Sequence, residues 1–246
     1  MTRLMFVAAL VSLASLPTLA AQQYRVELVR AAPGSLLEVI DLYRLQASVS
    51  AAAGEEPPLI MRHSQGDQWD LMILSPVPPL ATYFSPEQAE QWDRAARGVG
   101  AVSRRELETQ LRARIAWREE LFATGSPHEE LNTRRADAGF FHIEMFRALP
   151  GKHAALLEQR EMENSYLRAS GRPDNLVFAR VAGAGWDAFT IGFYRDLGHF
   201  AEKSPFSDEA LEEAARAAGF EARNRIGTYL RTLIDSHHDT LATLVR

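Results

Sequence analysis

The chain of 246 residues contains no cysteine. That absence excludes a disulfide framework, a zinc site built on thiolates and a lipid attached to an N-terminal cysteine. Because covalent cross-links are unavailable, the fold has to be stabilised by its apolar core. A chain of this size can form such a core, since it buries roughly 70–75% of the surface that its unfolded form exposes.

Charge of one sign and nucleotide-binding motifs are also scarce. The sequence carries 27 basic and 32 acidic residues, for a formal net charge of −5. It therefore lacks the basic footprint of a nucleic-acid-binding protein. There is no Gly-x-Gly-x-x-Gly motif, no phosphate loop and no Gly-x-Ser-x-Gly elbow. Nucleotide cofactors and serine-hydrolase chemistry are thus disfavoured.

Long apolar runs are limited to the N-terminus. Arg3 precedes the apolar segment Leu4–Leu16, and small residues follow it. This pattern predicts a secretory signal over residues 1–21 and a mature protein in the periplasm or outside the cell. An uncleaved anchor is the alternative, which Pro17 disfavours because a spanning helix needs ~20 apolar residues. After cleavage we expect no membrane association.

The most informative feature of the sequence is an internal duplication. Residues 24–74 align with residues 141–191 at an offset of 117 without a gap, with 12 identities in 51 positions. The identical pairs include Glu27 and Glu144, Pro33-Gly34 and Pro150-Gly151, Gly66 and Gly183, and Trp69-Asp70 and Trp186-Asp187. A period this long indicates a duplicated domain, since solenoid repeats run to roughly 20–50 residues.

Hydrophobic periodicity predicts the same elements in both halves. Residues 22–123 form the first half, the polar segment 124–139 a linker, and residues 140–246 the second half. Strands are expected at Tyr24–Val29, Leu59–His63, Trp69–Leu74, Phe141–Phe146, Leu176–Val181 and Trp186–Phe193. Helices are expected after Ser35 and at Glu87–Arg97, Ser103–Phe122, Lys152–Leu167, Asp208–Ala218 and Glu221–Leu244.

The predicted order in each half is the βαββα plan of a ferredoxin-like domain. We therefore expect an α+β protein with two tandem ferredoxin-like repeats that pack sheet to sheet into a pseudo-symmetric α/β barrel. This plan resembles a fused form of the dimeric α/β-barrel superfamily, which includes NIPSNAP-like and EthD-like proteins and cofactor-free monooxygenases. The resemblance covers about residues 24–245. It implies that two facing sheets enclose a lumen for a small ligand. Superfamily relatives dimerise, whereas fused halves also permit a monomer.

Strand alternation supplies the catalytic candidates, since residues two apart share a face. If Tyr24 and its alternate neighbours pack on the helices, Arg25, Glu27, His142 and Glu144 face the lumen. Two carboxylates in a partly dry cavity push their pKa values apart, so one could act as a base. The alternative is that both glutamates form structural ion pairs with Arg25 and Arg62, or lie at a wet barrel mouth.

Further ligand-binding candidates lie in the second half. His237 and His238 fall in the expected final helix, and Tyr194 follows the third strand, where it could line a cavity rim. A dye-decolourising peroxidase also pairs two ferredoxin-like halves and binds haem through a histidine of its second half. This chain lacks the Gly-x-x-Asp-Gly motif of those enzymes. Surface histidines, lumen acid/base residues and a haem ligand all remain open.

The sequence supports three functional hypotheses. The first is a small-molecule-binding protein, with or without cofactor-free acid/base or oxygenase-type chemistry in the lumen. The second is a haem-dependent peroxidase-like enzyme, although no cofactor is expected on the first reading. The third is a non-catalytic interaction module that uses the long helices. The Trp69-Asp70 and Trp186-Asp187 pairs are expected to be structural, with each Asp accepting hydrogen bonds from backbone N–H groups.

Overall fold

The computed structural model describes residues 21–245. Apart from Ala21, the predicted signal segment lies outside these residues. The strands are β1 (Gln22–Ala31), β2 (Leu59–Gln65), β3 (Leu71–Val77), β4 (Ile115–Gly125), β5 (Phe140–Ala148), β6 (Leu176–Gly183), β7 (Ala188–Tyr194) and β8 (Ile234–Leu244). The helices are α1 (Leu36–Ala52), α2 (Leu80–Tyr83), α3 (Pro86–Gly98), α4 (Arg104–Arg112), α5 (His128–Arg135), α6 (His153–Ala169), α7 (Leu197–Ala201), α8 (Asp208–Ala217) and α9 (Ile226–Arg231), with a 3-10 turn at Arg223–Arg225.

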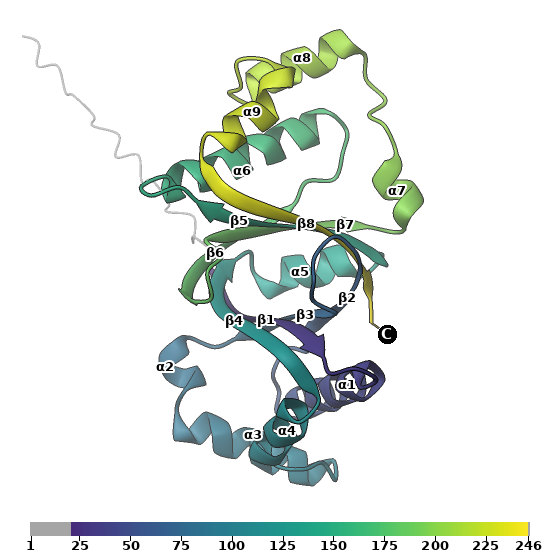
Figure 1. Cartoon of the computed structure of the whole chain (residues 1–246), viewed down its shortest axis with the longest axis vertical. Coiled ribbons are helices and arrows are strands. Elements are labelled where there is room, and N and C mark those ends of the chain that lie inside the picture. Colours follow the sequence, from purple (N-terminus) through teal and green to yellow (C-terminus); the bar gives the residue numbers. More distant parts are fainter. Residues whose placement is uncertain (1–20, 246) are drawn as a thin grey trace, which may run out of the picture.

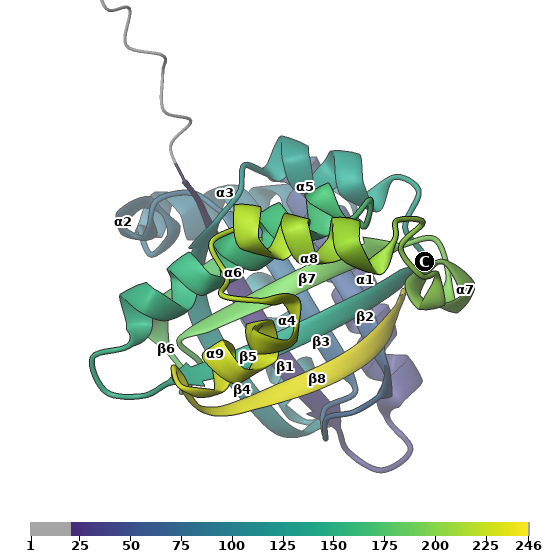
Figure 2. The same ribbon diagram turned by 90° about the horizontal axis from the view of Figure 1, so that it is seen from above.

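The strands form one closed antiparallel barrel in the order β1-β3-β2-β8-β5-β7-β6-β4. The first four strands of the chain are contiguous in the barrel, as are the last four. Two pairings, β2 with β8 and β4 with β6, join the two sets at their edges. The α+β class and the barrel are therefore confirmed, and the sheets of the two halves are continuous with each other (Figures 1 and 2).

Helices cover the outside of the barrel in two layers. Helices α1, α3 and α4 lie below the strands in Figure 1, and α6, α8 and α9 lie above them. Within residues 21–245, no helix combines the length and hydropathy needed to cross a bilayer. The short helix α5 contributes Leu131 to the apolar cluster inside the barrel.

The barrel interior is filled with apolar side chains from both halves. Tyr24 and Val26 of β1 share one buried cluster with Phe141 and Ile143 of β5. Phe178 packs at 5.2 Å from the Tyr24 ring, measured between ring centroids. The prediction that these strand positions face the helices is therefore wrong. Their alternation is as expected, but the inner and outer faces are reversed.

The reversal has a physical cause. Strands β1 and β5 carry buried side chains on both faces, so alternation separates two sets of side chains without telling which set lies inside. A small closed barrel has a dry interior that side chains must fill. The outer face is covered by helices, and Val29 packs there with Val39 and Tyr43 of α1. Arg25 and Glu27 lie on this outer face too.

The two predicted long helices are also wrong. The segment Ser103–Phe122 contains the short helix α4 and most of β4, and Glu221–Leu244 contains α9 and β8. Strand β4 pairs with β1, and β8 pairs with β5, each over nearly its full length. Pairing with a central strand overrides the helical propensity of Arg, Glu and Ala in these segments. The predicted linker 124–139 contains the end of β4 and helix α5.

The duplication is visible in local detail. Helices α1 and α6 begin 117 residues apart, at Leu36 and His153. The pairing of β1 with β4 shifts register at a bulge between Arg30 and Ala31. The pairing of β5 with β8 shifts at the equivalent place, between Arg147 and Ala148.

The repeated Trp-Asp pairs support these bulges. The backbone N–H of Ala31 donates to Asp70 Oδ2 at 2.8 Å, and that of Ala148 donates to Asp187 Oδ2 at 2.9 Å. Trp69 is buried in the interior cluster with its counterpart Trp186. The structural role predicted for the two Trp-Asp pairs is thus confirmed.

Glycines at the two seams provide a test of barrel closure. A Cβ on Gly66 (φ +116°) would lie 2.1 Å from the Asp239 carbonyl oxygen, and one on Gly183 (φ +99°) 2.5 Å from that of Glu120. We expect Gly66→Ala and Gly183→Ala each to lower the free energy of unfolding by about 2–4 kcal/mol, combining positive-φ strain with backbone overlap. Urea titration measures this loss.

Gly34 is the matched control, because it also has a positive φ (+83°) but no atom within 4 Å of its Cβ position. Gly34→Ala should cost only about 1 kcal/mol, from the backbone conformation alone. Equal losses in all three variants would show that close approach at the seams does not matter.

Candidate functional site

A cavity of about 580 Å³ lies between the outer face of the first-half sheet and its helices. Strand residues Arg25, Ser75, Val77, Arg118 and Glu120 line it on the barrel side. Helices and loops contribute Gln46, Ser50, Tyr83, Phe84, Trp92, Arg104, Leu107, Glu108 and Leu111, among others. A volume of this size suits a small organic ligand, for which pockets run to about 300–1,000 Å³.

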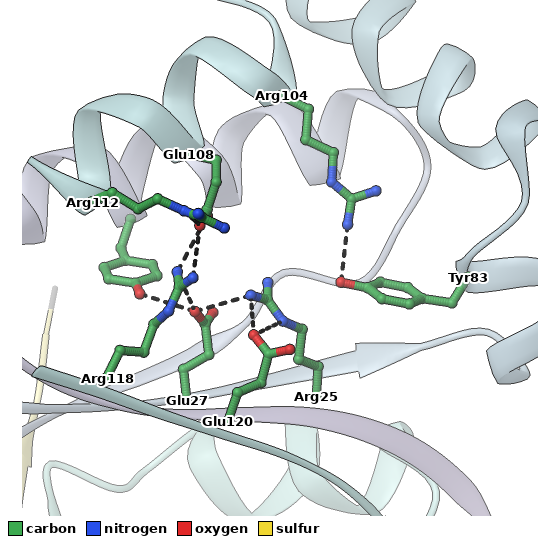
Figure 3. Close-up of polar contacts among 9 residues, drawn as sticks. Arg25, Glu27, Tyr83, Arg104, Glu108, Arg112, Arg118 and Glu120 are labelled. Atoms are coloured by element: carbon green, nitrogen blue, oxygen red, sulfur yellow. Dashed lines mark hydrogen bonds and ion pairs between the residues drawn. The ribbon is translucent and has the colours of Figure 1, made fainter. Parts of the chain in front are cut away.

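A network of charged residues forms the floor of this cavity (Figure 3). Arg25 donates through Nε and Nη2 to Glu120 Oε2 at 2.9 and 2.5 Å. Arg25 Nη2 also lies 3.0 Å from Glu27 Oε2, and Arg118 Nη1 lies 3.4 Å from the same oxygen. Tyr43 OH donates to it at 3.2 Å. Strand register explains the gathering, because Glu27 of β1 is paired directly with Glu120 of β4.

Glu27 is the most deeply placed member of this network. Its side chain is 1% exposed, and its Oε1 has no hydrogen-bond partner. It does not line the cavity itself but lies behind Arg25 and Arg118, which do. Burial raises the pKa of Glu27 above its ordinary value, and the positive charges of Arg25 and Arg118 only partly oppose that rise. The carboxyl therefore keeps its proton to a higher pH than an exposed glutamate does.

Glu108 shows the opposite behaviour on the facing helix. Burial would raise its pKa, but hydrogen bonds from Arg118 and Arg112 outweigh that effect and lower the pKa to about 2. The site thus contains one carboxylate that stays charged and one buried carboxyl that resists ionisation. Environments that separate two carboxyl groups in this way are typical of acid/base sites.

Aromatic side chains and one arginine mark another part of the cavity wall. Phe84 is 67% exposed and packs edge-on against Tyr83 and Phe122. Arg104 Nη2 donates to Tyr83 OH at 2.9 Å, and its guanidinium carbon lies 5.2 Å from the Tyr83 ring centroid. Among the salt bridges of residues 21–245, none joins the Arg104 guanidinium to a carboxylate. Arg104 is therefore a cation available to a ligand.

The second half contains an equivalent group of polar residues on the opposite side of the barrel. Glu144 of β5 is paired with Asp239 of β8, as Glu27 is with Glu120. Arg160 Nη1 lies 3.3 Å from Glu144 Oε2, and His142 Nε2 lies 3.2 Å from Asp239 Oδ1. Burial raises the pKa of Glu144, opposed by Arg160. Burial would lower the pKa of His142, but the hydrogen bond to Asp239 and the charge of Glu144 raise it.

The predicted catalytic residues thus form two separate groups. Arg25 lies beside Glu27, and His142 lies near Glu144, but each pair lies under its own helical layer, outside the barrel. The prediction that they share a lumen is wrong, because the space between the halves is filled by apolar side chains. Glu27 forms the alternative ion pair with Arg25. Arg62 is exposed, and within residues 21–245 it forms no ion pair with either glutamate.

The other predicted ligand-binding residues lie away from the cavity. Tyr194, at the end of β7, is 5% exposed and packs against Phe200 and His199. His237 and His238 lie on strand β8, so their placement in a final helix is wrong. His237 Nε2 lies 3.1 Å from Asp239 Oδ2, and His238 Nδ1 lies 2.8 Å from Asp67 Oδ2.

These two histidines do not fit a haem site. A haem ligand needs an imidazole nitrogen that faces space for the macrocycle. Neither histidine lines the described cavity. The His237 ring stacks on Phe146 at 6.1 Å, and the His238 ring packs against Trp186 at 4.7 Å. Within the described part of the chain, no three His, Asp or Glu side chains are grouped to hold a metal ion.

Several residues of the cavity could not be identified from the sequence. Arg118 and Glu120 fall within Ser103–Phe122, which was predicted to be a helix, whereas they lie on β4 opposite β1. Arg104, Tyr83 and Trp92 carry no motif that marks them. Their position follows from how α2, α3 and α4 cover the sheet, which the local sequence does not specify.

No protein-family model and no curated protein sequence matches this chain. Solved structures match its fold at low identity. An anthrone oxidase-like protein is 9% identical with a TM-score of 0.56, over 92% of both chains. A candidate monooxygenase from Fusobacterium nucleatum is 10% identical with a TM-score of 0.51, over 93% of this chain and 94% of the other.

A candidate monooxygenase from Lactobacillus acidophilus is 7% identical with a TM-score of 0.50, over 91% of this chain and 94% of the other. At these identities the similarity shows the fold alone. The chain therefore has the dimeric α/β-barrel fold, formed here by a single polypeptide.

The raised pKa of Glu27 predicts a pH dependence of stability. The unfolded carboxyl ionises near pH 4.3, whereas the folded one ionises at higher pH. Stability from this group is fully present below the unfolded pKa and is lost as pH rises through the folded pKa. Glu27→Gln cannot ionise, so its free energy of unfolding should rise relative to that of the parent protein over the pH range above about 4.3.

Urea unfolding of both proteins across that range measures the difference. The free energy of unfolding of Glu144→Gln should also rise relative to that of the parent protein as the pH increases, because burial raises the pKa of Glu144 too. A difference that is constant or shrinks with pH would contradict the buried, proton-retaining state of Glu27.

Proposed function

We propose that this protein binds a small aromatic organic acid in the cavity of its first half and carries out cofactor-free acid/base chemistry of the oxygenase type there. The observation that carries the proposal is Arg104, a cation without a carboxylate partner in the described ion pairs, on the wall of a cavity of about 580 Å³. A planar guanidinium recognises carboxylates and phenolates through paired hydrogen bonds.

The aromatic part of the ligand is supported by the composition of the cavity wall. Tyr83, Phe84 and Trp92 line it together with the apolar side chains Leu107 and Leu111. Aromatic rings prefer offset or edge-on contacts with one another, and each such pair contributes about 0.5–1.5 kcal/mol beyond the area it buries. A flat ring with one acidic substituent satisfies both the aromatic wall and Arg104.

The acid/base part rests on Glu27 and its neighbours. A buried carboxyl with a raised pKa suits a group that exchanges a proton near neutral pH. Arg25 and Arg118 lie between Glu27 and the cavity, and each contacts Glu27 Oε2. Arg25 also contacts the Glu120 carboxylate, and Arg118 that of Glu108. We propose that these contacts couple the protonation of Glu27 to the charge of the bound ligand. The oxygenase-type reaction class is supported by the names of the structurally similar proteins.

We further propose that each half is a ferredoxin-like repeat, with β4 or β8 added as its fourth strand. NIPSNAP-like and EthD-like relationships remain a hypothesis based on the element order. The closure of the barrel within one chain supports a monomer, and a homodimer is the alternative. No nucleic-acid partner is proposed, in keeping with the net charge of −5.

Ligand binding can be tested with 2-naphthoate and its neutral amide as probes, by isothermal titration calorimetry. The acid should bind and the amide should bind more weakly. Arg104→Gln should weaken the acid about 10–100-fold, the loss expected for a charge-assisted hydrogen bond worth about 1.5–3 kcal/mol. Arg97→Gln, an exposed position that does not line the cavity, is the matched control.

Equal affinity of the Arg104→Gln and Arg97→Gln variants would contradict the role of Arg104. Binding of acid and amide with the same affinity would contradict recognition of an organic acid.

Export is a separate proposal that rests on the N-terminal sequence. Cleavage after Ala20 or Ala21 should yield a protein in the periplasmic or secreted fraction that begins at residue 21 or 22. Intact mass measurement of the purified protein from that fraction tests it. A mass that includes residues 1–20 would show that the segment is retained.

A further inference from the structure

The two halves surround equivalent glutamates with different side chains. Positions 117 residues apart are occupied by Tyr43 and Arg160, Gln46 and Glu163, Glu55 and Arg172, and Val77 and Tyr194. In the first half, Gln46, Glu55 and Val77 line the cavity, and Tyr43 donates to Glu27. The second half thus has Arg160 and Arg172 where the first half has Tyr43 and Glu55, neither of which is a cation.

Arg160 is fully engaged by the protein itself. Its side chain is 1% exposed, and its Nε donates to Gln159 Oε1 at 2.7 Å. Its Nη1 lies 3.3 Å from Glu144 Oε2, and its Nη2 lies 2.5 Å from Glu163 Oε2. The guanidinium carbon also lies 4.7 Å from the centroid of the Phe146 ring. The three nitrogens and one face of the Arg160 guanidinium are thus engaged by protein groups, so its charge is not available to an acidic ligand.

Larger side chains occupy the rest of the equivalent space. Arg172 Nη2 donates to the Phe200 carbonyl oxygen at 2.9 Å, where the first half has Glu55. Tyr194, where the first half has Val77, packs edge-on against the Phe200 ring at 5.1 Å. That ring also lies 5.3 Å from the His142 ring. Through these contacts, Phe200 of α7 packs directly against side chains of β5 and β7.

We propose that Arg160, together with Arg172 and Tyr194, closes the second copy of the site, so that each chain binds one ligand and binds it in the first half. The inference rests on the proposed function, because it concerns the same site. The charge of Arg160 is neutralised by Glu144 and Glu163. Arg172 and Tyr194 fill the volume that remains open in the first half.

The test is the number of 2-naphthoate molecules bound per chain, measured by equilibrium dialysis at saturation. Four substitutions give the second half the residues of the first: Arg160→Tyr, Glu163→Gln, Arg172→Glu and Tyr194→Val. We expect one ligand per chain in the parent protein and two in the quadruple variant. Arg160→Lys, which retains the cation, is the control and should bind one. Circular dichroism and urea unfolding establish that each variant is folded.

Two ligands in the parent protein would overturn the inference, as would one ligand in a folded quadruple variant. If the quadruple variant does not fold, the parent protein alone decides. In Arg104→Gln, one tightly bound and one weakly bound ligand per chain would reveal an open second site and overturn the inference. Loss of all tight binding in that variant would support it.

Failure of the proposed function gives a different pattern. The parent protein would then bind no probe at all, whatever the second half does. In that case one ligand in the quadruple variant would contradict the equivalence of the two halves and overturn the inference as well. No ligand in a folded quadruple variant would overturn the inference together with the proposed function.

Discussion

The pairing of strand edges at two seams is the constraint on which the rest of this structure depends. Strand β2 pairs with β8 and β4 with β6, so neither half keeps a free sheet edge that would invite association. Each seam brings a backbone carbonyl against a glycine, Gly66 or Gly183, where a side chain would not fit. Once closed, the barrel has an interior from which water is excluded, and apolar side chains have to fill it. The duplicated chain thereby gains one large core instead of two half-covered sheets.

A filled interior determines where a ligand can bind. Space for a small molecule has to arise between the sheet and its helices, and the cavity of about 580 Å³ lies there. The register that closes the barrel also assembles the polar residues of this space. Because Glu27 is paired with Glu120, the arginines two residues before them, Arg25 and Arg118, reach the Glu27 carboxylate from neighbouring strands. Strand β4 thus contributes both to the seam with β6 and to the geometry of the site.

Much of this architecture could be predicted from the sequence, because the duplication repeats its turns and its strand alternation. The Trp-Asp pairs were correctly assigned to structure, since an element needed by the fold has to be present in both halves. The direction of the faces could not be predicted, because Tyr24 and Val29 are both buried and alternation distinguishes them only relative to each other. Strands β4 and β8 were missed for another reason. The Arg, Glu and Ala residues of β4 favour helix locally, and β8 was predicted as the continuation of a helix that in fact ends at Arg231. Only pairing with a strand distant in sequence makes these two segments strands.

The comparison of the two halves also limits what a buried glutamate can signify. Glu27 and Glu144 occupy equivalent positions and their pKa values shift in the same direction, although the Glu144 side chain is 13% exposed and that of Glu27 1%, so the carboxyl alone does not separate a binding half from a closed one. The difference lies in the cations around them. Arg160 reaches Glu144 from α6, whereas the equivalent Tyr43 brings Glu27 only a hydroxyl group. In the first half the charge needed to balance an acidic ligand therefore comes from Arg104 on the cavity wall, where a ligand can contact it. In the second half the same charge lies beneath the helix, already neutralised by Glu144 and Glu163.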